Sequence, residues 1–150
     1  MENTQPIREE HRHLMRGVEH LKQAADLIDE VGFEASKREA EKAIQFLNGQ
    51  LIPHARSEDD LLYPVVAGIM GSPRTTRTMS RDHLEVATMA GQLERAVEEG
   101  DLQMVRRLLY GLYHVLRLHF AKEEEIYLPL LDEHLTRKQA TELFGHMHAA

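Results

Sequence analysis

The chain contains no cysteine among its 150 residues, and only 5% of its residues are aromatic. Without cysteine the protein can form no disulfide, no thiolate zinc site, no iron–sulfur cluster and no thiol-based catalytic site. Any metal that this protein binds must therefore be held by nitrogen and oxygen atoms.

Long apolar stretches and basic clusters are also lacking. No apolar run approaches the ~18 residues that a membrane-spanning helix needs, and the N-terminal part lacks the basic start and apolar middle of a secretory signal. The formal net charge is -7, which argues against nucleic acid or an anionic membrane surface as a partner. We therefore expect a soluble, cytoplasmic protein that binds neither nucleic acids nor membranes.

Helix-forming residues in a helical pattern dominate what is present. Ala, Leu, Glu, Gln, Arg and Met are abundant, whereas aromatic and β-branched runs are few, so a mostly helical fold is expected. Apolar positions recur in alternating steps of four and three along four segments, which is the spacing of one helix face. The length suits a single domain spanning residues 1–150. We expect four long helices, and a short C-terminal fifth, beginning near Gln5, Ser36, Ser72, Asp101 and Thr136.

Capping and helix-breaking residues predict where these helices end. Gly32 is expected to end the first helix in a left-handed conformation, and a capping box starting at Ser36 is expected to open the second. Pro53 and Pro64 each remove a backbone hydrogen bond, which predicts a bend or fraying in that helix. Residues 146–150 are expected to be frayed.

A repeated motif carries the chemistry of the sequence. His54-x-x-x-Glu58 is followed by Asp-Asp-Leu-Leu-Tyr-Pro, and His119-x-x-x-Glu123 is followed by Glu-Glu-Ile-Tyr-Leu-Pro. A histidine and a glutamate four residues apart lie on the same face of a helix. Each motif can therefore offer one nitrogen and one carboxylate to a common point.

Two more histidines, His11 and His83, lie on the apolar faces of the first and third helices. Short turns make successive helices antiparallel, so residues equally far from a turn lie at the same height in a bundle. His11 and His54 are equally far from the first predicted turn, and His83 and His119 are nearly equally far from the last. We therefore predict that the four histidines and the two motif glutamates occupy one layer.

Six polar groups in one buried layer have two explanations, a hydrogen-bonded structural network or a metal site. Buried glutamates are rare and costly, and inward-facing histidine–glutamate pairs are the ligand pattern of dinuclear sites in four-helix proteins, so we favour metal. Tyr127, eight residues after His119, is a candidate for a supporting position, whereas Tyr63 lies about half a turn out of phase with His54. The candidate metal ligands are His11, His54, Glu58, His83, His119 and Glu123.

Imidazole and carboxylate ligands without sulfur suit iron, manganese or zinc. If both glutamates bridge two ions and the histidines divide equally, the protein fills about eight of the roughly twelve positions that two six-coordinate ions need. An oxo or hydroxo bridge would fill two more, which leaves one open position on each ion. Such positions favour a small ligand such as dioxygen, hydrogen peroxide or nitric oxide.

With this order of motifs, the sequence resembles the hemerythrin-like, HHE cation-binding family. The resemblance implies a non-haem di-iron centre in an up-down-up-down four-helix bundle. Oxygen-carrying hemerythrins have a further histidine where this chain has Ala87, and an aspartate in place of Glu123. The site is therefore more similar to those of hemerythrin-like proteins associated with repair of iron centres, nitric oxide handling or peroxide breakdown, although the repair proteins carry an additional cysteine-bearing domain.

Three functions are consistent with this reading. The first is a di-iron oxidoreductase or scavenger that reacts with dioxygen, peroxide or nitric oxide in oxidative or nitrosative stress defence. The second is a reversible oxygen or nitric oxide binding or sensing module. The third is iron storage or a structural metal site, for which manganese or zinc could replace iron. Both a monomer and a homodimer agree with the sequence.

Overall fold

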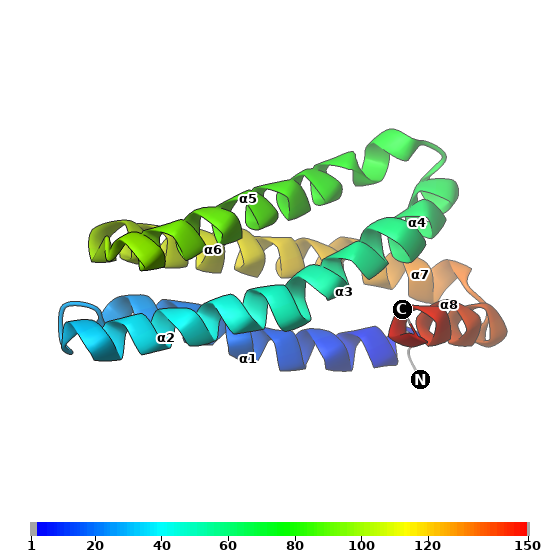
Figure 1. Cartoon of the computed structure of the whole chain (residues 1–150). Helices are drawn as coiled ribbons and strands as arrows, with labels where there is room; N and C mark the ends of the chain where they lie inside the picture. The colour runs from blue at the N-terminus through cyan, green and yellow to red at the C-terminus, as the bar shows by residue number, and fades with distance from the viewer. Residues whose placement is uncertain (1–2, 150) are drawn as a thin grey trace.

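The computed structural model describes residues 3–149, which form helices joined by short turns (Figure 1). The α-helices are α1 (Gln5–Leu27), α2 (Phe33–Phe46), α3 (Ile52–Ser57), α4 (Tyr63–Met70), α5 (Arg77–Glu99), α6 (Leu102–Lys122), α7 (Leu128–His134) and α8 (Arg137–Ala149). The remaining helical segments are the π-helical turns η1 (Leu47–Leu51), η2 (Glu58–Leu62) and η4 (Glu123–Tyr127), and the 3-10 turn η3 (Pro73–Thr76). The all-helical fold expected from the sequence is confirmed.

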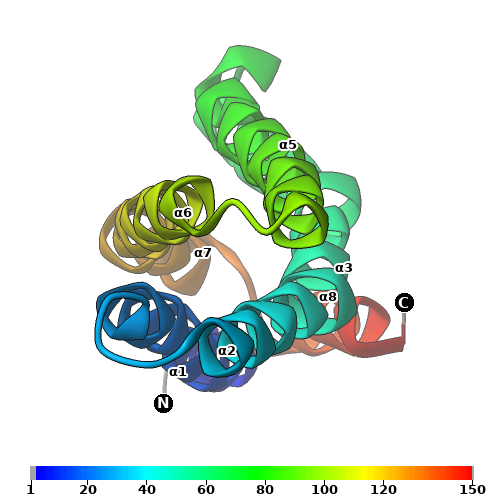
Figure 2. The same ribbon diagram turned by 60° about the vertical axis from the view of Figure 1, so that its left-hand side comes forward.

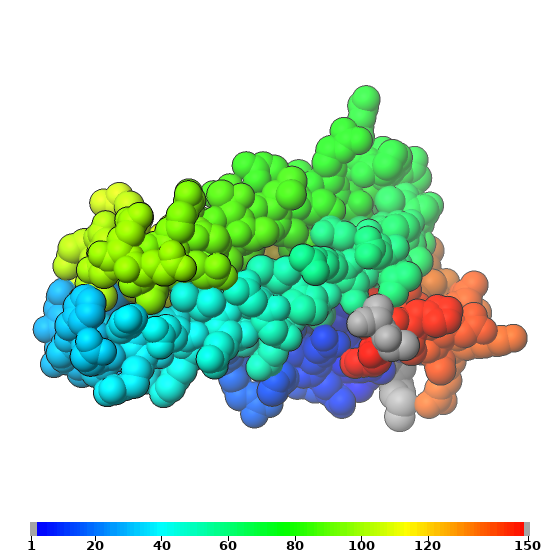
Figure 3. Space-filling model, in the orientation of Figure 1, coloured from blue at the N-terminus to red at the C-terminus, as the bar shows by residue number. Residues whose placement is uncertain are grey.

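The helices form four long arms, with each arm turning back beside the one before it (Figures 1 and 2). The arms are α1, the continuous run from α2 to α4, α5, and the continuous run from α6 to α7. α6 packs along both α1 and α5. α8 lies against the end of the bundle where α1 begins, as the space-filling view also shows (Figure 3). Within residues 3–149, no helix combines the length and the apolar character needed to span a membrane.

Several predicted helix ends are confirmed. Gly100 ends α5 with a left-handed φ of 70°, and the Asp101 carboxylate caps α6 by accepting a hydrogen bond from the Met104 backbone N–H at 3.1 Å. Thr136 and Gln139 form a capping box at the predicted start of α8. The Thr136 N–H donates to Gln139 Oε1 at 2.9 Å, and the Gln139 N–H donates to Thr136 Oγ1 at 3.2 Å. These caps satisfy backbone groups that a helix end would otherwise leave unpaired.

The turn between the first two arms differs from the prediction. α1 already ends at Leu27, and Gly32 has a φ of −66°, so Gly32 is not a left-handed cap. α2 begins directly after it, at Phe33. Because of this early start, Ser36 lies inside the first turn of α2, where its hydroxyl donates to the Ile28 carbonyl at 3.4 Å instead of forming a capping box.

The C-terminal segment is also more ordered than predicted. Residues 146–149 continue α8, and Met147 is only 8% exposed. Ala150 lies outside the described residues. Burial of this apolar side chain against the bundle explains why the helix does not fray, since packing supplies most of a short helix's stability.

Prolines explain the π-helical turns. Each turn ends two residues before a proline, at Pro53, Pro64 and Pro129. A proline cannot donate the usual backbone hydrogen bond, and its ring collides with the carbonyl four residues earlier. A wider turn relieves that collision without ending the helix. The extra residue in η2 also shifts the helix register by one position. As a result Leu62 and Val66 are fully buried, whereas the residue directly before each of them is only partly buried.

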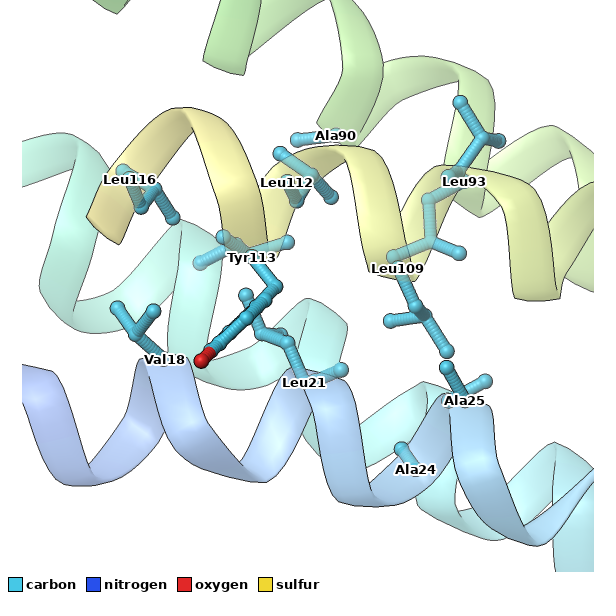
Figure 4. Close-up of a cluster of buried hydrophobic side chains, with 14 of the residues drawn as sticks. Val18, Leu21, Ala24, Ala25, Ala90, Leu93, Leu109, Leu112, Tyr113 and Leu116 are labelled. Atoms are coloured by element: carbon cyan, nitrogen blue, oxygen red, sulfur yellow. The ribbon is translucent and has the colours of Figure 1, made fainter. Parts of the chain in front are cut away.

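The apolar core consists of two clusters. The first fills the half of the bundle near the α1–α2 and α5–α6 turns and is shown in part in Figure 4, with Val18, Leu21, Leu93, Leu109 and Leu112 among its members. The second lies at the other end and contains Ile7, Leu62, Tyr63, Val66, Met79, Tyr127, Leu128, Leu131, Ala140, Phe144 and Met147. α8 thus supplies the last three members of the second cluster.

A polar layer separates the two clusters. On α1, His11 lies between Ile7 of the second cluster and Leu14 of the first. On α5, His83 lies in the same way between Met79 and Val86. The two histidine–glutamate motifs occupy the corresponding stretch of the other two arms, so the site is enclosed by apolar side chains above and below.

Candidate metal centre

The structure brings all six sequence-predicted residues together in this layer. Each histidine comes from a different arm, and the two glutamates begin the π-helical turns η2 and η4. Glu58 and Glu123 are fully buried, His11 and His119 are 2% exposed, and His54 is 5% exposed. His83 is the most accessible of the six, with 9% of its side chain exposed.

Glu58 occupies the middle of the layer and faces all four imidazoles. Its Oε2 lies 3.1 Å from His54 Nε2 and 3.4 Å from His11 Nε2. Its Oε1 lies 3.1 Å from His83 Nε2 and 3.7 Å from His119 Nε2. One carboxylate therefore joins two groups that could each hold a metal ion, His11–His54–Glu58 and Glu58–His83–His119.

Glu123 adds a second buried carboxylate beside the second group, with its Oε1 3.0 Å from His119 Nε2. Among residues 3–149, neither Glu123 Oε1 nor His54 Nε2 has a hydrogen-bond partner, although charged atoms lie about 3 Å away. Buried polar atoms without hydrogen bonds are costly and rare. Atoms of this kind that point into a nitrogen- and oxygen-lined centre fit the role of metal ligands.

A second set of carboxylates surrounds the imidazoles. Every outer nitrogen faces one of them: His11 Nδ1 lies 2.9 Å from Glu124, His54 Nδ1 2.8 Å from Glu10, His83 Nδ1 3.1 Å from Asp59, and His119 Nδ1 2.9 Å from Asp82. A carboxylate at Nδ1 fixes the ring orientation and leaves Nε2 for the metal. All four Nε2 atoms consequently face inward.

These outer carboxylates form a ring around the bundle, because each belongs to a different arm from the histidine that it contacts. They were not predicted from the sequence, yet each directly precedes or follows an inner residue, as in Glu10-His11 and Glu58-Asp59. Three of the four outer carboxylates also accept a hydrogen bond from another side chain. Arg8 donates to Glu124, Lys122 to Asp82 and Ser80 to Asp59. An acidic residue directly next to an inner residue in the sequence is the pattern from which the outer carboxylates could have been predicted.

The tyrosine beside the site is Tyr63, and not the predicted Tyr127. The Tyr63 hydroxyl lies 3.1 Å from His119 Nε2 and 3.3 Å from Glu58 Oε1. The wide turn η2 between His54 and Tyr63 rotates the ring inward, which regular helix spacing could not anticipate. The Tyr127 hydroxyl instead donates to the Thr75 carbonyl at 3.0 Å, away from the cluster.

The charges in the layer shift the pKa values of its members. Burial lowers the pKa of His11, His54 and His119, but the surrounding carboxylates outweigh it and raise these values to about 9, 10 and 11. Burial also opposes ionisation of Glu58, yet the charge of His54 and neighbouring hydrogen bonds hold its pKa well below its usual range. Burial and the charge of Glu58 raise the pKa of Glu123 to about 7. Without a metal, the three imidazoles carry protons at neutral pH.

A narrow apolar cavity reaches the cluster between α3, α5 and α6. Its walls beside the polar residues are Leu51, Ala55, Val86, Leu116 and Phe120, and its volume is about 10 Å³. A single water molecule needs ~10–15 Å³, so only a very small ligand fits. A larger hollow of about 460 Å³ between the start of α1 and α8 is lined by none of the six predicted residues.

The outer carboxylates should control how tightly a metal is held. We expect Asp82→Asn to lower metal affinity ~10- to 100-fold, the usual cost of losing such a partner, because Asp82 orients His119 and is anchored by Lys122. Competition with a chelator of known affinity measures this change. Glu85→Gln is the matched control, since Glu85 lies on the same helix, 47% exposed, and pairs with Arg81. An unchanged affinity in Asp82→Asn would contradict the role assigned to this carboxylate.

Comparison with known proteins agrees with the geometry. Residues 3–131 match the family model described as Hemerythrin HHE cation binding domain, and α8 lies outside the match. Neither a curated protein nor a solved structure was found to match the chain. Since the family match covers most of the chain and its histidines and glutamates converge on a cluster that could hold a metal, the chain belongs to the hemerythrin HHE cation-binding family.

Proposed function

We propose that this protein is a hemerythrin-type di-iron protein, a single domain over residues 1–150 with the up-down-up-down arrangement of its four arms. The two ions are bound by His11, His54, Glu58, His83, His119 and Glu123. Its function is reaction with dioxygen, hydrogen peroxide or nitric oxide in oxidative or nitrosative stress defence. The observation that carries the proposal is the position of Glu58, whose two oxygens each face a different pair of imidazoles.

The donor atoms support two ions in preference to one. A single ion could not use both oxygens of Glu58 together with histidines on opposite sides of that carboxylate, whereas a bridging carboxylate serves both sides. The donor set is nitrogen and oxygen alone, which suits iron, manganese and zinc. The family relationship favours iron among these metals. Iron bound by these residues would supply redox chemistry, because each ion can hold either the Fe(II) or the Fe(III) state.

The residues around the site limit which small molecules can reach the metal ions. The outer carboxylates fix the imidazole orientations, and the apolar layers above and below exclude bulk water. The small cavity beside His54 and His83 has about the volume of one water molecule, so it favours the smallest ligands and excludes bulky substrates. The apolar cavity wall equally favours the second candidate function, reversible binding of dioxygen or nitric oxide, which would produce an optical band that disappears when the gas is removed.

Peroxide consumption tests the reactive function. Iron-loaded protein is expected to consume hydrogen peroxide faster than an equal amount of free iron, and His54→Ala is expected to lose most of this activity because a ligand is missing. His13→Ala is the matched control, since His13 is exposed on α1 and its ring Nε2 lies 3.2 Å from Gln50 Oε1, outside the metal layer. Activity no greater than that of free iron, or activity unaffected by His54→Ala, would remove the proposal of a reactive centre.

A further inference from the structure

Tyr63 places a phenol oxygen inside the metal layer. The side chain is 2% exposed, and its hydroxyl lies close to four polar atoms, at 3.1 Å from His119 Nε2, 3.3 Å from Glu58 Oε1, 3.4 Å from His83 Nε2 and 3.5 Å from Glu123 Oε2. A tyrosine hydroxyl can donate one hydrogen bond and accept up to two. Hydrogen bonds can therefore serve at most three of these four neighbours.

The four atoms Tyr63 Oη, Glu58 Oε1, His83 Nε2 and His119 Nε2 form a compact polyhedron. His83 Nε2 lies 3.0 Å from His119 Nε2, and the other five separations are between 3.1 and 3.7 Å. Nitrogen and oxygen ligands bound at ~2.1 Å from an ion are separated by about 3.0 Å in octahedral and about 3.4 Å in tetrahedral geometry. The spacing of these four atoms is thus that of ligands around one ion.

We propose that Tyr63 is a protein ligand of the ion held by His83 and His119. This assignment rests on the proposed di-metal function and goes beyond the six ligands that define it. The internal repeat shows that the feature belongs to one half only, because the position that corresponds to Tyr63 after the second motif is Leu128, which is fully buried. The hydroxyl contacts Oε1 of Glu58, the oxygen that faces His83 and His119.

The consequence is that the two ions are unequal. Counting both glutamates as bridging, the ion near His83 and His119 gains a fifth protein donor from Tyr63, while the ion near His11 and His54 has no equivalent. The latter ion therefore keeps more positions for an external ligand. The expectation of equal open positions on both ions is replaced by an asymmetric centre.

Optical and resonance Raman spectra of the protein loaded with Fe(III) test the assignment. A tyrosine bound to Fe(III) gives a phenolate-to-iron charge-transfer band in the visible region and enhanced tyrosinate ring vibrations under that band. We expect both signals in the wild-type protein and their complete loss in Tyr63→Phe. Tyr127→Phe is the matched control, because it removes a hydroxyl from the same apolar cluster that donates to Thr75 and not to the metal layer. We expect this variant to keep both signals.

Iron content separates the two possible failures. Wild-type protein that holds two Fe(III) ions without tyrosinate vibrations would overturn the role of Tyr63 and leave the di-iron proposal intact. Wild-type protein that cannot hold two ions would overturn the proposed function and this assignment with it. The Raman measurement on the wild-type protein needs no variant, so the test remains decisive even where Tyr63→Phe folds poorly.

Discussion

Glu58→Gln is expected to abolish binding of the metal pair. Glu58 is fully buried, and its two oxygens lie 3.1 Å from His54 Nε2 on one side and 3.1 Å from His83 Nε2 on the other. Glutamine keeps the shape but replaces one oxygen with an NH2 group, which is a donor and cannot bind a cation. Loss of the bridge and its charge should cost more than the ~10- to 100-fold that loss of an outer partner costs.

Metal analysis after loading and desalting measures this result. We expect two ions per wild-type chain and no more than one in Glu58→Gln. Removal of this carboxylate lowers the pKa of the neighbouring histidines, and the outer carboxylates still contact their Nδ1 atoms, so circular dichroism should still report a helical fold. Asp60→Asn, which removes one negative charge at an exposed position of the same turn, should keep both ions. Two retained ions in Glu58→Gln would contradict a bridging role.

Besides the hydroxyl proton that Tyr63 must lose to bind iron as a phenolate, metal uptake is expected to release about three imidazole protons at neutral pH. His11, His54 and His119 have pKa values near 9, 10 and 11, because neighbouring carboxylates outweigh burial, and an imidazole must be neutral at the nitrogen that binds the metal. Below pH 9 each of these protons competes with the metal. Between about pH 7 and 9 the imidazole protons alone should therefore raise the affinity by about a thousandfold for each pH unit, since three of them are displaced together.

Calorimetric titration with metal in buffers of different ionisation enthalpy counts the released protons. The metal-free protein should show the opposite pH trend in stability. The histidine pKa values are raised above the unfolded value of ~6.5, so their stabilising effect is complete below that pH and is lost as pH rises through about 9 to 11. Metal binding without proton release would show that these imidazoles are not the ligands.

The sequence predicted the layer because helix geometry is regular over most of each arm. The four-and-three spacing placed His11 and His83 inward, and the equal distances of His11 and His54 from their shared turn brought them to one height. A one-residue error in the position of a helix end has little effect on such an argument, since each residue adds only ~1.5 Å of rise. For this reason the convergence survived the wrong start of α2.

The parts that could not be predicted depend on departures from that regularity. The wide turn η2 follows from Pro64, and its extra residue brought Tyr63 into the layer and Leu62 into the core. The outer carboxylates depend on which arms are neighbours, because Glu10 contacts His54 on the next arm and not a residue on its own. Spacing along one helix carries no information about that pairing.

X-ray diffraction at the iron absorption edge, from crystals of the iron-loaded protein, locates the bound ions. Two anomalous peaks are expected within the buried layer, one between Glu58 Oε2 and the imidazoles of His11 and His54, and one between Glu58 Oε1 and those of His83 and His119. A single peak, or iron bound only at the protein surface, would contradict this expectation.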